Sequence, residues 1–287
     1  MSTIAVVIWG IVKIIAIAVF FANVITYAIA YYERANTPFE KAGNEPLPGI
    51  LQILLSFLFE LITIYISIII YPIGYIEPDP LREINTSSGE RPVILVHGYF
   101  MNRASFLVFY LRLRQTGKKA VFTINLRPLT SPIEDLAQQL AEKVEEVMLL
   151  TKMEKVDIVA HSMGGLAARY YIEQLGGANK VYTFVNIGSP NHGTKLSVFG
   201  FGANAREMRP NSDFIKSLET TISNSGNVRY FSIWSTFDNI ILPQESPVLP
   251  EPATNIKFHN IGHLALLFSQ RVFLKVRELL EEKENIP

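Results

Sequence analysis

The chain has 287 residues, enough for one large domain or for one domain with an appended segment, and 49% of its side chains are hydrophobic. Its 26 basic and 26 acidic residues cancel, and no basic stripe is present, so nucleic acid is not an expected partner. Because cysteine is absent, disulfides, metal–thiolate sites and a cysteine nucleophile are excluded.

Two long apolar segments, residues 4–32 and 50–75, occupy most of the first 80 residues. Each is longer than the ~20 residues that a helix needs to cross the ~30 Å hydrocarbon core of a bilayer. A cleaved signal peptide fits the first segment poorly, because no basic region precedes it and it exceeds the usual ~7–15 apolar residues. A buried core helix is the other alternative, and two such lengths in succession argue against it. The sequence therefore predicts a transmembrane helical hairpin over residues 1–80.

The linker of this hairpin, residues 33–49, contains three prolines and should turn the chain round, which leaves both ends of the hairpin on one side of the membrane. Basic residues near the two ends balance each other, with Arg34 and Lys41 on one side and Arg82 and Arg91 on the other. The positive-inside rule therefore does not determine which side carries the rest of the chain.

Two charged residues lie inside the apolar segments. Lys13 is close enough to the start of the first segment to extend its amine to the membrane interface. Glu60 lies near the middle of the second, where a lone carboxylate is costly and usually faces protein. In an antiparallel hairpin the two would differ in depth by ~13 Å, so a direct ion pair is not expected. We expect Glu60 to be neutral or to face a second copy of the chain, which would make the protein a homo-oligomer.

The remainder, residues 81–287, alternates short apolar segments with amphipathic ones. This alternation predicts an α/β domain, with a mostly parallel sheet and helices on both faces. Strands are expected at residues 92–97, 119–125, 156–160, 181–187, 228–235 and 255–259, and helices at residues 103–115, 133–150, 163–175 and 264–282.

The segment Ala160-His161-Ser162-Met163-Gly164 joins a predicted strand to a predicted helix. It is close to the nucleophile elbow G-x-S-x-G, with alanine in place of the first glycine. The residues two before and two after the serine approach each other and must be small, and a slightly opened turn can absorb the alanine methyl group. Ser162 is therefore a candidate nucleophile, placed where helix N–H groups favour an oxyanion. An ordinary helix N-cap is the alternative.

An oxyanion-binding loop is expected at the end of the first strand, at Val96-His97-Gly98-Tyr99. There the backbone N–H of Tyr99, together with that of Met163, is predicted to bind a developing oxyanion. His97 is expected to fix this loop rather than to take part in catalysis.

His263, in a loop between the last strand and the closing helix, is the candidate base, and His259, inside that strand, is the alternative. The two histidines have the i, i+4 spacing of a metal site, but no third ligand supports one, so no metal and no cofactor are expected.

Asp238, directly after a strand, is the candidate acid, with Asp213 and Glu245 as alternatives.

These segments resemble the α/β-hydrolase lipases, most closely the minimal bacterial lipases that carry A-H-S-M-G-G. The matching stretches, in the family's order, are VILVHGY, VDIVAHSMGGLAARYY, NIGSPNHGT, FDNIILP and IGHLALLFSQRV. The resemblance implies an α/β-hydrolase fold with Ser162, His263 and Asp238 as nucleophile, base and acid, and with Tyr99 and Met163 as oxyanion donors.

The same resemblance implies that the loop containing His192 lies beside the acyl site. Residues 195–227 are a predicted short lid, whose Phe199, Phe201 and Met208 are candidate substrate-binding residues; packing against the sheet is the alternative for these side chains. The hairpin departs from the family, whose minimal lipases are typically secreted.

The sequence therefore predicts a membrane-anchored serine hydrolase that cleaves carboxylic esters of lipids through an acyl-enzyme. Its expected partners are a lipid or ester substrate and the bilayer, and its expected location is a bacterial inner membrane. An acyltransferase or acyl-thioesterase using the same triad is the alternative, and an inactive membrane-bound binding protein is a third.

Overall fold

The computed structural model describes residues 2–37, 47–76, 89–118, 120–218, 222 and 228–281. The middle of the hairpin linker, the start of the second expected strand at Lys119, the last part of the expected lid and Glu282 lie outside the described residues.

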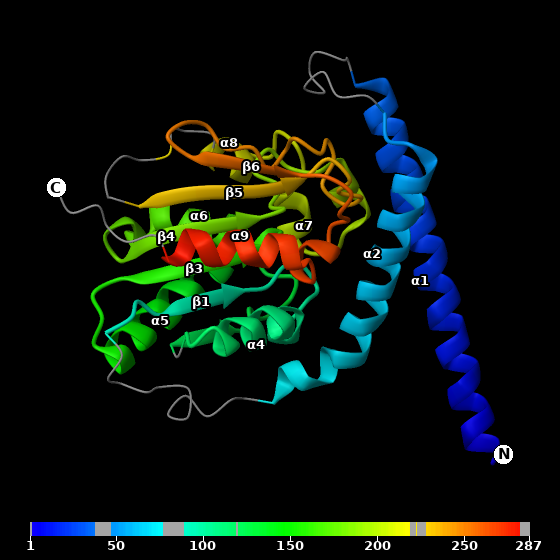
Figure 1. The fold of residues 1–287 in the computed structure, drawn as a ribbon, viewed down its shortest axis with the longest axis horizontal. Coiled ribbons are helices and arrows are strands. Elements are labelled where there is room, and N and C mark those ends of the chain that lie inside the picture. Colours follow the sequence, from blue (N-terminus) through cyan, green and yellow to red (C-terminus); the bar gives the residue numbers. More distant parts are fainter. Residues whose placement is uncertain are drawn as a thin grey trace.

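A six-stranded sheet forms the centre of the molecule (Figure 1). Every neighbouring pair of strands is parallel, in the order β2-β1-β3-β4-β5-β6. From β1 the chain adds β2 on one side of the sheet and all later strands on the other, so the strand order reverses beside β1. In open α/β sheets, ligands bind at such a point, outside the carboxyl ends of the strands. The strands are β1 (Val93–Val96), β2 (Val121–Ile124), β3 (Val156–His161), β4 (Val181–Ile187), β5 (Arg229–Ser235) and β6 (Thr254–Phe258).

Helices cover both faces of the sheet, which explains why strands such as β3 and β4 are buried along their whole length. One core cluster packs α5 and α6 on one face, and a second packs α4 and α9 on the other. The expected α/β fold class is confirmed. The helices are α4 (Leu107–Gln115), α5 (Ile133–Thr151), α6 (Met163–Gln174) and α9 (Gln270–Glu281), with the short α7 (Ala203–Glu207) and with the short α8 (Asp213–Leu218), whose Phe214 stacks on Tyr170 of α6.

The closing helix begins later than expected. A short 3-10 turn at Ala265–Leu267 precedes α9, which begins at Gln270. Ser269 caps α9, since its hydroxyl accepts the N–H of Val272. The residues directly after His263 are therefore a separate turn.

The N-terminal hairpin consists of α1 (Thr3–Asn36) and α2 (Ile50–Ile70), the latter continued by a 3-10 turn at Tyr71–Tyr75. By length and composition both helices could cross a membrane. The pair lies lengthwise against the sheet domain, by which we mean the described residues from 89 to 281 (Figure 1). The side of α2 that faces this domain carries a stripe of buried polar residues at helical spacing: Ser56, Glu60, Thr63 and Ser67.

Candidate active site

Ser162 stands at a sharp turn between the end of β3 and the start of α6. Its backbone has φ 55° and ψ −130°, in the region of positive φ that residues other than glycine rarely occupy. Its side chain makes no capping hydrogen bond to the described helix α6, so the N-cap interpretation lacks its defining contact. Backbone strain of this kind persists only where the surrounding structure imposes it, and it clusters at functional sites.

The turn requires small residues on both sides of Ser162. A Cβ on Gly164 would lie 2.3 Å from the carbonyl oxygen of His97, so only glycine fits there. Ala160 is fully buried in the core, in register with Val96 on β1 and Asn186 on β4. The alanine that departs from G-x-S-x-G is therefore accommodated within the sheet.

His263 and Asp238 form a buried pair, with 2.8 Å between His263 Nδ1 and Asp238 Oδ2. Asp238 Oδ1 accepts the N–H groups of Ile240 and Ile241, which fixes the carboxylate and leaves Oδ2 for the imidazole. Burial alone would lower the pKa of His263, but the charge and hydrogen bond of Asp238 and the charge of Glu60 raise it above its usual value. Because Nδ1 donates to Asp238, the acceptor of the neutral ring is Nε2.

The alternative acids and base lie elsewhere. Asp213 is in the first turn of α8, and Glu245 forms an ion pair with Arg34 of α1 at 2.9 Å. His259 Nδ1 makes a hydrogen bond with the Thr236 hydroxyl at 3.1 Å. Of the candidates that the sequence left open, the structure brings Asp238 to His263.

Two further histidines fix the main chain around the site. His161 Nε2 donates to the carbonyl oxygen of His263 at 3.1 Å. His97 Nδ1 donates to the carbonyl oxygen of Gly98, and its Nε2 accepts the N–H of Leu126. Burial lowers the pKa of both rings, that of His97 to about 4 and that of His161 well below its usual value, so both are neutral at pH 7.

The loop after β1 approaches the serine closely. A Cβ on Gly98 would lie 2.8 Å from Ser162 Cβ, so only glycine lets this backbone come so near. Within the described residues, the backbone N–H groups of Tyr99 and Met163 meet no acceptor. Both groups therefore remain available to a ligand beside Ser162, where the sequence predicts an oxyanion.

Comparisons with known proteins agree with this fold. A family described as a domain of unknown function, DUF7379, matches residues 75–198. Lipase B of Aspergillus fumigatus is similar with a TM-score of 0.61 and 20% identity over 69% of this chain, which spans 54% of that lipase. The mature lipase BlEst2 of Bacillus licheniformis is similar with a TM-score of 0.59 and 18% identity, over 71% of this chain and 94% of that one. The phospholipase PlaB of Legionella pneumophila has a TM-score of 0.54 and 13% identity, over 68% and 60% of the two chains.

The chain has the α/β-hydrolase fold. The resemblance inferred from the sequence is thereby confirmed at the level of the fold.

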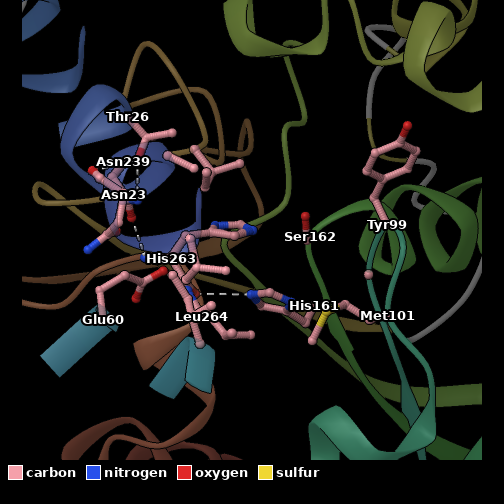
Figure 2. A pocket seen from close by; sticks show the side chains of 15 residues that line it. Asn23, Thr26, Glu60, Tyr99, Met101, His161, Ser162, Asn239, His263 and Leu264 are labelled. Carbon is pink, nitrogen blue, oxygen red and sulfur yellow. Dashed lines mark hydrogen bonds between the residues drawn. The ribbon is translucent and has the colours of Figure 1, made fainter. Parts of the chain in front are cut away.

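Two cavities meet at Ser162. The first, of about 340 Å³, contains His263 and is walled by Asn23 and Thr26 of α1 and by Glu60 of α2. Figure 2 shows Ser162 in this cavity between His263 and Tyr99. The second, of about 530 Å³, is mostly apolar and lies between α1 and the segment around Leu196–Met208. The cavities share Ala22, Thr26, Tyr99, Ser162 and Ile240.

The predicted substrate-binding residues divide into two pairs. Phe199 and Met208 line the second cavity. His192 instead donates its Nε2 to the carbonyl oxygen of Val248, and the side chain of Phe201 is 75% exposed; neither is among the residues that line the two cavities. The Tyr99 hydroxyl donates to the carbonyl oxygen of Phe201 and accepts its N–H, which ties the loop after β1 to the predicted lid.

The expectation that Glu60 faces a second copy of the chain is wrong. Glu60 is 1% exposed, and its Oε1 and Oε2 accept the N–H groups of Leu264 and Ala265 at 2.9 and 2.8 Å. A carboxylate inside an apolar helix is costly unless it is hydrogen-bonded, and the turn after His263 supplies both donors.

Sequence reasoning missed that both hairpin helices wall the site. The polar stripe on α2 is the signal that could have shown it, because a membrane helix needs no such stripe against lipid. Among the described residues no cluster of three or more His, Cys, Asp or Glu side chains is arranged to hold a metal ion.

Proposed function

We propose that this protein is a serine hydrolase that cleaves carboxylic esters of lipids and is held at a membrane by its N-terminal hairpin. The observation that carries the proposal is the strained Ser162 beside His263, whose Nδ1 is bonded to the buried Asp238 at 2.8 Å. As the sequence predicts, we divide the chain into a hairpin over residues 1–80 and a catalytic domain over residues 81–287 with a short lid. The two spans and the bacterial inner membrane stay predictions.

In the proposed mechanism, His263 Nε2 takes the proton of Ser162 Oγ as the oxygen attacks the ester carbonyl. The developing oxyanion accepts hydrogen bonds from the N–H groups of Tyr99 and Met163. His263 returns the proton to the leaving alcohol, and the acyl group remains on Ser162. Water, activated by the same imidazole, then releases the carboxylic acid. Asp238 keeps Nδ1 protonated and stabilises the imidazolium.

A lipid substrate is favoured by the second cavity. Its walls are mostly apolar, and Ile25 and Ile29 of α1 line it together with Met208. Such a cavity binds an acyl chain through burial of apolar surface, whereas a small soluble ester would leave it unfilled. The lipases and the phospholipase with similar folds support the same substrate class.

The test uses the full chain with phospholipid vesicles, a triacylglycerol emulsion and a water-soluble short-chain ester, with Ser162→Ala as the blank. We expect fatty acid to be released from the vesicles or the emulsion faster than the short ester is cleaved. Hydrolysis limited to the short ester would contradict the lipid assignment. With an added alcohol, transfer of the acyl group to it instead of water would identify an acyltransferase, and preferential cleavage of thioesters an acyl-thioesterase.

A further inference from the structure

The hairpin has two unlike surfaces. Towards the sheet domain it presents polar groups, such as Thr26, whose hydroxyl accepts from Asn239, and Arg34, which pairs with Glu245. Away from that domain it presents exposed apolar side chains along both helices, among them Ile14, Phe21 and Ile25 on α1 and Leu51, Leu55, Leu58, Ile62 and Ile69 on α2. We call this second surface the outer apolar face. A continuous exposed apolar face along two helices marks an interaction site.

The contact between the hairpin and the sheet domain is as long as a membrane is thick. Tyr27 and Ser56 are hydrogen-bonded and so lie at the same level of the hairpin. Arg34 is ~10 Å from that level towards the linker, and Ile70 is ~21 Å from it in the opposite direction, at 1.5 Å per helical residue. Beyond Ile70, Asn125 still donates to the carbonyl oxygen of Gly74. The docked length therefore matches the whole ~30 Å hydrocarbon core.

This length is incompatible with a hairpin that stands upright in the bilayer while the sheet domain stays in water. The sheet domain would be drawn through the hydrocarbon core, and residues 81–287 carry 23 basic and 20 acidic side chains. Charged groups at that depth cost at least ~2.5–3.5 kcal/mol each. The lipid must therefore meet the hairpin from the other side.

We propose that the hairpin lies along the membrane with its outer apolar face in the lipid, and that the sheet domain and the linker end of the hairpin are on the same side. This rests only on the membrane-binding part of the proposed function, since no catalytic step enters it. Lys13, whose amine lies 5.2 Å from the centre of the Trp9 ring, can then extend to the headgroups. Ile25 is 56% exposed on the outer face and also lines the second cavity, so that cavity borders the membrane.

The natural absence of cysteine allows a clean test with single cysteines. Ala35 is exposed in the last turn of α1, and Gln138 is exposed on α5 of the sheet domain, so each is replaced by cysteine in a separate variant. Each full-length variant is placed in sealed vesicles and treated with a membrane-impermeant maleimide. We expect both to be labelled from the same side, whereas two membrane spans place them on opposite sides.

Labelling of Ala35→Cys from the opposite side, or only after detergent, would overturn the proposal. A flotation experiment with phospholipid vesicles tests whether the outer apolar face binds lipid or a second copy of the chain. We expect the full chain to float with the vesicles. A chain that instead remains in the dense fraction as a dimer would show that the face binds a second copy, which also overturns the proposal.

A second inference concerns Glu60 and rests on the proposed hydrolase chemistry. The segment from Gly262 to Ala265 wraps around its carboxylate, since a Cβ on Gly262 would lie 2.5 Å from Glu60 Oε2 and the next two N–H groups after His263 donate to it. The His263 residue itself is held by Asp238 through Nδ1, by Asn239 through its N–H and by His161 through its carbonyl. Glu60 is the contact that comes from the hairpin.

We infer that Glu60 is a positioning residue for His263, so that catalysis depends on the docking of α2. Without the carboxylate, the N–H groups of Leu264 and Ala265, the latter buried, lose their acceptors, and the turn that carries the imidazole is free to shift. A shift of ~1 Å in a catalytic group can lower the rate by ~10²-fold.

Glu60→Gln tests this, because glutamine keeps the size but presents an amide NH₂ to one of the two N–H donors. Glu33→Gln is the matched control, since it breaks the contact of Glu33 with Lys195 (2.5 Å), also between hairpin and sheet domain but away from His263. We expect Glu60→Gln to lower kcat by ~10–100-fold with KM little changed. Glu33→Gln should keep the wild-type kcat.

The pH profile separates positioning from a loss of folding. Among the described residues, Asp238, Glu60 and the ring of His161 lie around His263, and Tyr27 lies beside Glu60; the charge of Glu60 raises the pKa of His263. Its removal should move the acid limb of kcat/KM to lower pH, because the imidazole then stays neutral to a lower pH. An unchanged limb with kcat reduced only in proportion to the folded fraction would overturn the inference. Failure of wild-type Ser162 to react with a fluorophosphonate would instead refute the proposed function.

Discussion

Ser162→Ala is expected to lower kcat/KM for ester hydrolysis by about 10⁵–10⁶-fold, since the serine, the histidine and the acid act as one unit. The variant keeps the oxyanion donors and the cavities, so a residual rate above the uncatalysed one should remain. It should also fold normally, because the Ser162 side chain makes no capping hydrogen bond to α6 that alanine would lose.

The measurement is labelling with a fluorophosphonate probe together with the kinetics. The control is Ser217→Ala, because Ser217 is an exposed serine of α8. Wild type and this control should be labelled, and Ser162→Ala should not. Equal labelling of wild type and Ser162→Ala would show that another residue is the nucleophile.

Asp238→Asn is expected to lower kcat by ~10⁴-fold. Oδ1 accepts the N–H groups of Ile240 and Ile241, so the amide oxygen of asparagine will take the place of Oδ1 and its NH₂ will face His263 Nδ1. Nδ1 then becomes the acceptor and Nε2 carries the proton, so the imidazole cannot accept the proton of Ser162.

Asp213→Asn is the matched control, because Asp213 is the acid that the sequence left as an alternative. We expect its kcat to stay close to that of wild type, and circular dichroism should show both variants folded. Loss of activity in Asp213→Asn with an active Asp238→Asn would reverse the assignment of the acid.

The elements of the fold could be predicted because they depend on short stretches of sequence. Runs such as Val93–Val96 are apolar and short, and α5 has apolar residues at helical spacing, so each predicts its own structure without knowledge of its neighbours. The strained backbone of Ser162 is equally local, whereas the need for glycine at position 164 comes from the distant carbonyl oxygen of His97. The start of α9 was misplaced although its signal, the cap at Ser269, is also local.

The sequence by itself determined an α/β chain with a candidate nucleophile, base and acid in hydrolase order, and two helices apolar enough for a membrane. Only the tertiary structure decided that Asp238 rather than Asp213 or Glu245 meets His263, and that Glu60, 204 residues before Leu264, binds the turn beside it. Hydropathy reports how much a helix prefers an apolar environment but not which of its faces meets protein. That choice depends on contacts between distant segments, which exist only once the chain is packed.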